Sequence, residues 1–181
     1  MHPIPPLADL GRRIVIFGPS NSGKSTLAAA LSSRLAIPAV HLDQLHHQPH
    51  SDWVPRPKDE FHTLQRAAIA EPAWIMDGNY SALTAERLAR ATGAIVLDEN
   101  HWLRLLRYFR RTLFERHRPG ALEGSRDSIK WSMIHWVAVA SRHNGARYRS
   151  MVDGTDLPRA YCQSMAELKT LYDAWGLERR G

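Results

Sequence analysis

A short apolar stretch near the N-terminus leads into residues of the types that hold a polyphosphate. Arg13-Ile-Val-Ile-Phe17 is followed by GPSNSGKST, which begins at Gly18, and then by a helix-forming stretch. Glycines let the backbone wrap around an anion, while successive N–H groups and the helix N-terminus point at its oxygens. Lys24 is placed to reach the β- and γ-phosphates of a nucleoside triphosphate, and the Ser25 hydroxyl to ligate Mg²⁺. We therefore expect this loop to bind ATP together with Mg²⁺.

Three aspartates each follow a short apolar stretch, and they are the carboxylates best placed to act beside the phosphates: Asp43, Asp77 and Asp98. Mg²⁺ is held by one or two carboxylates and keeps most of its waters, so we expect Asp77 to contact it directly or through water. Asp43 opens a long loop, which suits a residue that orients a phosphoryl acceptor or takes its proton. The competing interpretation is that each aspartate only caps the next helix or turn.

Two loops, 44–57 and 78–82, follow these aspartates and are expected to determine which acceptor binds. Trp53 and Tyr80 lie in them, and either ring could stack on a planar acceptor. Because His46 and His47 are adjacent, their side chains are expected to diverge, and the chain has a single cysteine. We therefore do not expect a zinc site.

Positive charge is concentrated between residues 104 and 126. Arg107 and Arg111 are four residues apart, so they share one face of a predicted helix, and Arg118 borders a glycine-rich segment. We expect these three arginines to belong to a lid that closes over the site and clamps the transferring phosphoryl group. The same charge could instead form a surface for nucleic acid, and a single arginine could simply be solvated.

The chain alternates between predicted strands and predicted helices. The strands are expected at 13–17, 39–42, 73–76, 94–97 and, more weakly, 159–163. The helices are expected at 24–34, 58–70, 83–91, 101–115, 128–142 and 165–175. This order predicts a three-layer α/β/α fold with a parallel sheet that gathers the phosphate loop and the aspartates at one edge. The phosphate-loop motif is typical of a P-loop NTPase with this α/β fold. Residues 44–57 are expected to be an irregular loop and residues 1–11 a flexible lead-in.

The composition is that of one soluble domain. The chain has 181 residues, 44% of them hydrophobic and 23% charged, and its net charge of +6 favours anionic ligands. Cys162 is its only cysteine, and no apolar run has the length of a membrane span. With no secretory signal at the N-terminus, we expect a cytoplasmic protein. The sequence indicates no oligomeric state.

Four motifs in order resemble the adenylate-kinase-like P-loop proteins, and more narrowly the group labelled DNA topology modulation protein. They are GPSNSGKSTLA, His41-Leu-Asp43, Trp53-Val-Pro-Arg-Pro57 with Phe61, and Trp74-Ile-Met-Asp-Gly-Asn-Tyr80. The resemblance covers most of residues 13–145. It departs from the family at Asn100-His101, where a proline-arginine pair is common, and it is poor over 142–158.

The resemblance implies a five-stranded parallel core in a single domain, a substrate-binding insert at about 44–72 and lid helices at about 101–145. It implies that ATP is held by the loop residues Gly18, Ser20, Asn21, Ser22, Gly23, Lys24, Ser25 and Thr26. It also implies that the acceptor is faced by Asp43 and by the turn that contains Asp77, Gly78, Asn79 and Tyr80. Arg107, Arg111 and Arg118 would belong to the lid.

Together these features predict a kinase that transfers the γ-phosphoryl group of Mg-ATP to a nucleoside, a nucleotide or a similar small acceptor. Two other interpretations stay open. One is a nucleotide-dependent regulator that binds nucleic acid through its basic helix, and the other is a nucleotide-binding protein without useful turnover.

Overall fold

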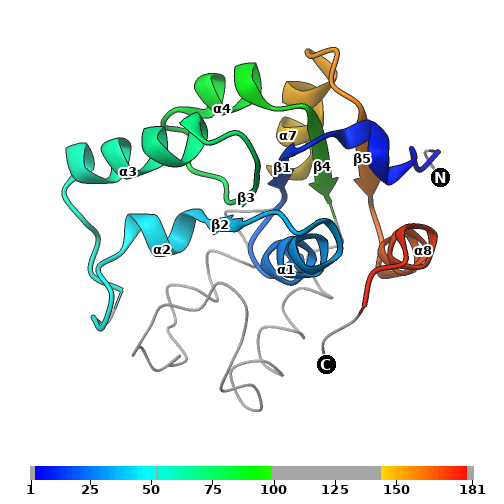
Figure 1. Cartoon of the computed structure of the whole chain (residues 1–181), viewed down its shortest axis with the longest axis horizontal. Helices are drawn as coiled ribbons and strands as arrows, with labels where there is room; N and C mark the ends of the chain where they lie inside the picture. The colour runs from blue at the N-terminus through cyan, green and yellow to red at the C-terminus, as the bar shows by residue number, and fades with distance from the viewer. Residues whose placement is uncertain (1–2, 52, 99–143, 179–181) are drawn as a thin grey trace.

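Five parallel strands form the centre of the molecule in a computed structural model that describes residues 3–51, 53–98 and 144–178 (Figure 1). The strands are β1 (Arg13–Phe17), β2 (Ala39–His41), β3 (Trp74–Asp77), β4 (Gly93–Leu97) and β5 (Arg159–Cys162). Their spatial order is β2-β3-β1-β4-β5. The expected α/β fold with a five-stranded parallel sheet is therefore confirmed.

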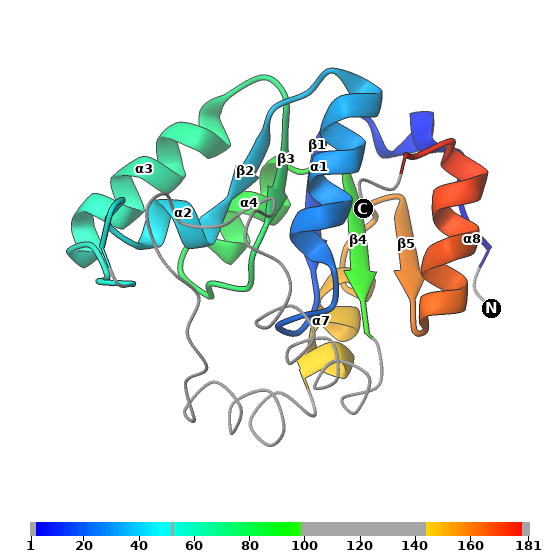
Figure 2. The same ribbon diagram turned by 90° about the horizontal axis from the view of Figure 1, so that it is seen from below.

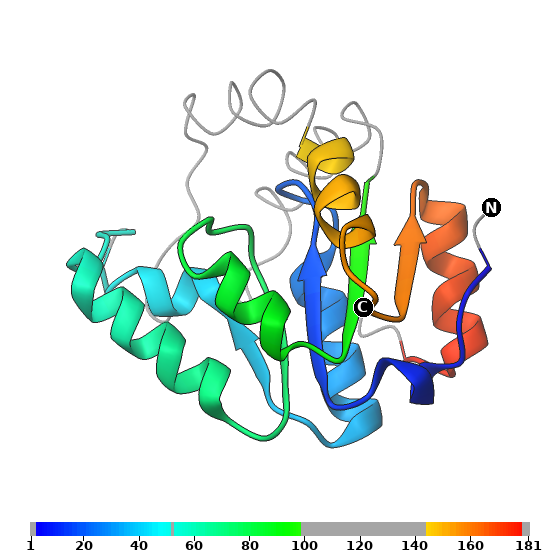
Figure 3. The ribbon, with the colours of Figure 1, turned by 90° about the horizontal axis from the view of Figure 1, so that it is seen from above.

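Helices cover both faces of this sheet, which makes three layers (Figures 2 and 3). They are η1 (Leu7–Leu10, a 3-10 helix), α1 (Lys24–Leu35), α2 (Leu42–His46), α3 (Lys58–Ala70), α4 (Thr84–Arg90), α7 (Asn144–Asp153) and α8 (Met165–Trp175). Alternate residues of β1 belong to different cores, because successive side chains of a strand point to opposite faces. Ile14 and Ile16 pack in the core with α1 and α8, whereas Val15 and Phe17 pack in the core with α7.

Local sequence explains where α8 begins and ends. Ser164 caps α8, since its hydroxyl accepts from the Glu167 N–H at 3.2 Å, and the Glu167 carboxylate accepts from the Gln163 N–H at 2.7 Å. The pair resembles a capping box, although the carboxylate accepts from the residue before the N-cap instead of from the N-cap itself. Gly176 ends the same helix in the left-handed conformation, with a φ of 61°. Every helix within the described residues is too short or too polar to span a lipid bilayer.

The sheet brings two separate loops to one edge. Ile16 pairs with Asp77 across β1 and β3, so the chain leaves both strands at the same level, at Gly18 and at Gly78. The Gly78 N–H also donates to the Ile16 carbonyl at 3.4 Å. Ligands of open parallel sheets bind at the carboxyl ends of the strands. Any functional site is therefore expected at this edge.

Two segments differ from the sequence-based expectation. Residues 42–46 form α2, although residue 42 was expected to end a strand and residues 44–46 to begin an irregular loop. Residues 3–11, expected as a flexible lead-in, pack on the core: Leu10 is fully buried, and the Trp175 indole donates to the Pro5 carbonyl at 2.9 Å. Helix α7 was not predicted from the sequence. The helices expected at 101–115 and 128–142 lie outside the described residues.

Candidate functional site

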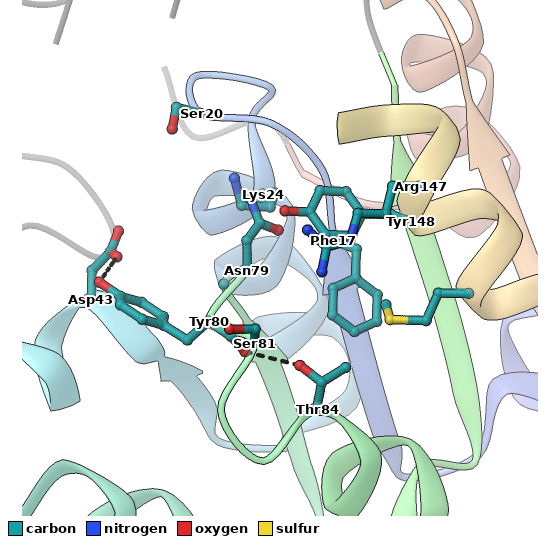
Figure 4. A pocket seen from close by; sticks show the side chains of 12 residues that line it. Phe17, Ser20, Lys24, Asp43, Asn79, Tyr80, Ser81, Thr84, Arg147 and Tyr148 are labelled. Carbon is teal, nitrogen blue, oxygen red and sulfur yellow. Dashed lines mark hydrogen bonds between the residues drawn. The ribbon is translucent and has the colours of Figure 1, made fainter. Parts of the chain in front are cut away.

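A cavity of about 520 Å³ opens at the carboxyl edge of the sheet (Figure 4). This volume lies within the range of small-molecule sites, about 300–1,000 Å³. Its walls come from the phosphate loop, α2, the loop after β3 and α7. The lining residues are Phe17, Ser20, Lys24, Asp43, Gly78, Asn79, Tyr80, Ser81, Thr84, Arg147, Tyr148 and Met151. The structure thus brings the predicted phosphate loop and the predicted acceptor loop to one cavity.

The phosphate loop has the backbone conformation that its glycines allow. The φ angles of Gly18, Asn21 and Gly23 are 150°, 63° and 91°. Residues with positive φ turn successive N–H groups toward one side and form an anion-binding concavity. Lys24 Nζ donates to the Pro19 carbonyl at 2.9 Å, so the ammonium group lies over the loop that it is expected to serve. Ser25 and Thr26 follow in the first turn of α1.

We predict that Gly18→Ala destabilises the protein. A Cβ at position 18 would lie 2.4 Å from the Leu97 carbonyl oxygen and 2.9 Å from Ser22 Oγ, and the residue would keep an unfavourable φ. Overpacking against backbone costs about 1–3 kcal/mol, so the midpoint of thermal unfolding should fall by several degrees. Gly154→Ala is the matched control, because its Cβ would meet nothing closer than 3.6 Å. Equal unfolding temperatures for the two variants would contradict this packing.

Asn79 joins the two loops. Its Nδ2 donates to the Gly18 carbonyl at 2.6 Å, and its Oδ1 accepts from the Gly18 N–H at 3.3 Å. The side chain therefore satisfies both backbone groups of the first residue of the phosphate loop. The sequence predicted that Asn79 binds the acceptor. The structure shows that its amide also holds the phosphate loop, through the two hydrogen bonds to Gly18.

Asp43 and Tyr80, both predicted as acceptor-binding residues, contact each other. The Tyr80 hydroxyl donates to Asp43 Oδ1 at 2.7 Å. Burial and the neighbouring carboxylate raise the pKa of Tyr80, which keeps the phenol protonated as the donor. The Tyr80 ring stacks on His46, with centroids 4.6 Å apart, and meets the edge of Phe61 at 5.1 Å. The Asp43 carboxylate is thus held at the cavity wall by a phenol that is itself held by packing.

Asp77, predicted to serve Mg²⁺ and the acceptor, lies at the end of β3 with 3% of its surface exposed. Its Oδ1 accepts from His41 Nδ1, at 2.8 Å, across the neighbouring strand. Asp77 is not among the residues that line the cavity. His41 was not singled out from the sequence, and only its place in the motif before Asp43 could have suggested it.

Trp53 lies apart from the cavity and does not line it. Its ring meets the edge of His47, with centroids 5.1 Å apart, and its backbone has a φ of 59°. A short antiparallel bridge between His47 and Pro55 folds this segment back on itself. The interpretation of Trp53 as a stacking platform therefore has no support in this cavity.

Several residues that line the cavity were not predicted as site residues: Phe17, Ser81, Thr84, Arg147, Tyr148 and Met151. The Tyr148 ring stacks on Phe17 at 5.6 Å and 11°, and Arg147 is exposed beside it. Apolar residues at 148, 151 and 152 have the spacing of a helix face, and this was the available signal for α7. Asp98, the third candidate carboxylate, forms an ion pair with Arg149 of α7 at 3.1 Å.

The arginines predicted to form a lid, Arg107, Arg111 and Arg118, lie outside the described residues. Their placement relative to the cavity therefore stays a prediction.

Comparison with solved structures places this fold among small kinases. The chain superimposes on a gluconokinase from Sinorhizobium meliloti 1021 with a TM-score of 0.56 and 15% identity, over 92% of this chain and 91% of that chain. A shikimate kinase from Aquifex aeolicus VF5 gives a TM-score of 0.48 and 15% identity, over 91% and 96% of the two chains. The first likeness shows that the chain has a P-loop kinase fold.

No protein-family model matches the sequence, and no curated protein matches it significantly. The likeness to solved structures is therefore a likeness of fold at low sequence identity.

Proposed function

We propose that the protein is an ATP-dependent kinase that transfers the γ-phosphoryl group to a hydroxyl group of a small acceptor, such as a nucleoside or a nucleotide. The observation that carries this proposal is the shared cavity: Lys24 and Ser20 of the phosphate loop line the same space as Asp43 and Tyr80. Phosphoryl transfer depends on holding donor and acceptor in line within a charged, water-excluding site. A fold shared with small kinases supports the same conclusion.

The residues have distinct roles in this proposal. The amides of Gly18 to Ser25 and the Lys24 ammonium group bind the phosphates and stabilise the charge that develops on the transferred group. Asp43 orients the acceptor hydroxyl and receives its proton. A bond forms between the acceptor oxygen and the γ-phosphorus, the bond between that phosphorus and the β–γ bridging oxygen breaks, and ADP leaves.

The residues near the loop suit a magnesium ion. The Ser25 hydroxyl, in the first turn of α1, and the Asp77 carboxylate, at the end of the adjacent strand β3, are the hard oxygen donors that Mg²⁺ prefers. Asp77 Oδ1 already accepts from His41. His41 would therefore orient the carboxylate that holds the ion or one of its waters. Magnesium supplies charge neutralisation on the phosphates when bound.

We also propose how the chain is organised. Residues 1–181 form one domain, residues at about 44–72 form the substrate-binding insert, and residues at about 101–145 form the lid. Arg107, Arg111 and Arg118 would clamp the transferring group from that lid. The narrower kinship with adenylate-kinase-like DNA topology modulation proteins rests on the four motifs in the phosphate loop, at 41–43, at 53–61 and at 74–80.

The experiment that tests the proposal is a screen of acceptors for ADP release, with Mg-ATP as the donor. We expect at least one hydroxylated small molecule to raise ADP release at least tenfold above the rate without acceptor. The phosphorylated product should be identified by mass spectrometry, because ADP release alone also reports hydrolysis. Lys24→Ala should remove the stimulation.

A different result would favour a nucleotide-dependent regulator. In that case no acceptor would be phosphorylated, and binding to DNA would weaken steeply with salt, as expected when several phosphates are neutralised. Filter binding at graded salt measures this directly. If no product forms and DNA does not bind, the remaining interpretation is a nucleotide-binding protein without turnover.

A further inference from the structure

Arg87 is a charged residue in the interior of the protein. It lies on α4 with 0% of its surface exposed, and within the described residues no carboxylate forms an ion pair with it. Burial lowers the pKa of its guanidinium to about 10, which still leaves the group charged at neutral pH. A buried charge without a counter-ion is costly unless hydrogen bonds satisfy it.

The guanidinium group makes those hydrogen bonds to the loop after β3. Nη1 donates to the Gly78 carbonyl at 3.1 Å, and Nη2 donates to the Tyr80 carbonyl at 2.9 Å. Nη2 also donates to Thr84 Oγ1 at 3.1 Å, and that hydroxyl donates to the same Tyr80 carbonyl at 2.9 Å. The planar fork therefore fixes the backbone on both sides of Asn79.

The same group also contacts the strand that leads into the phosphate loop. The Arg87 Cζ lies 5.3 Å from the centre of the Phe17 ring, the distance of a cation–π contact. Phe17 directly precedes Gly18, which Asn79 holds through two hydrogen bonds. One guanidinium group thus touches the end of β1 and the loop that presents Asn79 and Tyr80.

We propose that Arg87 is a positioning residue that fixes the acceptor loop relative to the phosphate loop. By holding the carbonyls of residues 78 and 80, it sets the direction in which the Asn79 amide reaches Gly18 and the Tyr80 hydroxyl reaches Asp43. Its charge is used within the protein, on backbone carbonyls, and it contacts no reacting atom. The kinetic part of this inference rests on the proposed kinase function, whereas the structural part does not.

The test compares Arg87→Met, which keeps the length of the side chain and removes its donors, with Arg90→Met. Arg90 lies three residues further along the same helix, is exposed, and donates to the Ala70 carbonyl away from the cavity. Amide hydrogen exchange measured by NMR reports each loop separately. The Gly18 and Gly78 amides, which donate to Asn79 Oδ1 and to the Ile16 carbonyl, are the probes. The Asp98 amide, which donates to the Cys162 carbonyl, is the internal reference.

In Arg87→Met we expect the amide hydrogens of Gly18 and Gly78 to exchange at least tenfold faster than in the wild type. The exchange rate of the Asp98 amide should stay within twofold of the wild-type rate. Arg90→Met should leave all three unchanged. Equal acceleration at all three positions would indicate a purely structural role and would overturn the proposal, as would unchanged exchange at positions 18 and 78. If Arg87→Met does not fold, Arg87→Lys is measured instead. Lysine keeps the positive charge but lacks the two guanidinium nitrogens that donate to the carbonyls of residues 78 and 80. The same expectations apply to it.

Kinetics provide a second readout. With an acceptor from the screen, Arg87→Met should lower kcat/KM for the acceptor at least tenfold, while the affinity for Mg-ATP, measured by calorimetry, changes less than threefold. A parallel loss of both would contradict a role centred on the acceptor loop. If the screen yields no acceptor, the proposed function fails, and the exchange measurement still decides the role of Arg87.

Discussion

The Lys24→Ala variant is expected to lose phosphoryl transfer, with kcat lower by about 10²- to 10³-fold, the usual effect of removing one donor that stabilises transition-state charge. The fold should persist, because the side chain contacts the loop through a hydrogen bond from Nζ to the Pro19 carbonyl at 2.9 Å. Such a bond contributes about 0.5–1.5 kcal/mol. The unfolding temperature should therefore change by only a few degrees.

Three measurements make this expectation specific: turnover with an acceptor from the screen, calorimetry with Mg-ATP, and thermal unfolding. Lys169→Ala is the matched control, because Lys169 is an exposed lysine on α8. It should retain wild-type turnover. Wild-type turnover in Lys24→Ala would mean that the loop does not hold the reacting phosphates, and the proposed kinase function would be wrong.

The sheet and most helices were predictable because each leaves a local pattern. Apolar stretches bounded by glycine, proline or aspartate mark the buried strands, and β1 and α3 have the expected bounds, Arg13–Phe17 and Lys58–Ala70. A chain in which parallel strands alternate with helices can adopt few sheet topologies. In all of them the carboxyl ends of the strands lie at one edge of the sheet. For this reason the amino-acid sequence is sufficient to predict that the phosphate loop, Asp43 and Tyr80 lie near one another.

The errors occur where distant contacts decide the local structure. Helix α2 is only one turn long, and its His46 ring lies against Tyr80 and Phe61, which are 34 and 15 positions away in the sequence. Helix α7 is fixed by the stack of Tyr148 on Phe17. The N-terminal segment is fixed by Trp175, 170 residues away from Pro5. Propensity over a short window contains none of this information.

Arg87 shows the same limit at the level of function. In the sequence it is one of two arginines on a short helix, where solvent exposure is the ordinary expectation. Its role depends on two carbonyls at residues 78 and 80, and a carbonyl has no sequence signature. Trp53 shows the same limit, since its contact with His47 has no signature in the sequence, and its stacking on a ligand stays a prediction.

The Asp43→Asn variant should reveal how much the reaction depends on the carboxylate at the cavity wall. In the wild type the Tyr80 hydroxyl donates to Asp43 Oδ1 at 2.7 Å. Asparagine keeps an oxygen that can accept the same hydrogen bond, so the local structure should persist. The amide cannot take a proton from the acceptor. General-base catalysis contributes about 10²- to 10⁴-fold, and because positioning matters more than the base in phosphoryl transfer, we expect a loss near the lower figure, about 10²-fold in kcat.

Tyr80→Phe distinguishes the role of the Asp43 carboxylate from the role of the hydrogen bond that orients it. The substitution keeps the ring that stacks on His46 and removes the hydrogen bond to Asp43. Because the carboxylate remains, kcat should fall by no more than about tenfold. Asp173→Asn, at an exposed aspartate of α8, is the control and should behave as the wild type.

The ratio of the two effects distinguishes two roles for Asp43. If the carboxylate receives the proton, Asp43→Asn is far more damaging than Tyr80→Phe, while the affinity for Mg-ATP, measured by calorimetry, stays within threefold of the wild type in both variants. If Asp43 serves only to hold Tyr80, the loss in Asp43→Asn cannot exceed the loss in Tyr80→Phe, since asparagine still accepts the hydrogen bond. Equal turnover in the two variants would therefore remove Asp43 from the chemistry and assign the acceptor contact to the loop that Arg87 holds.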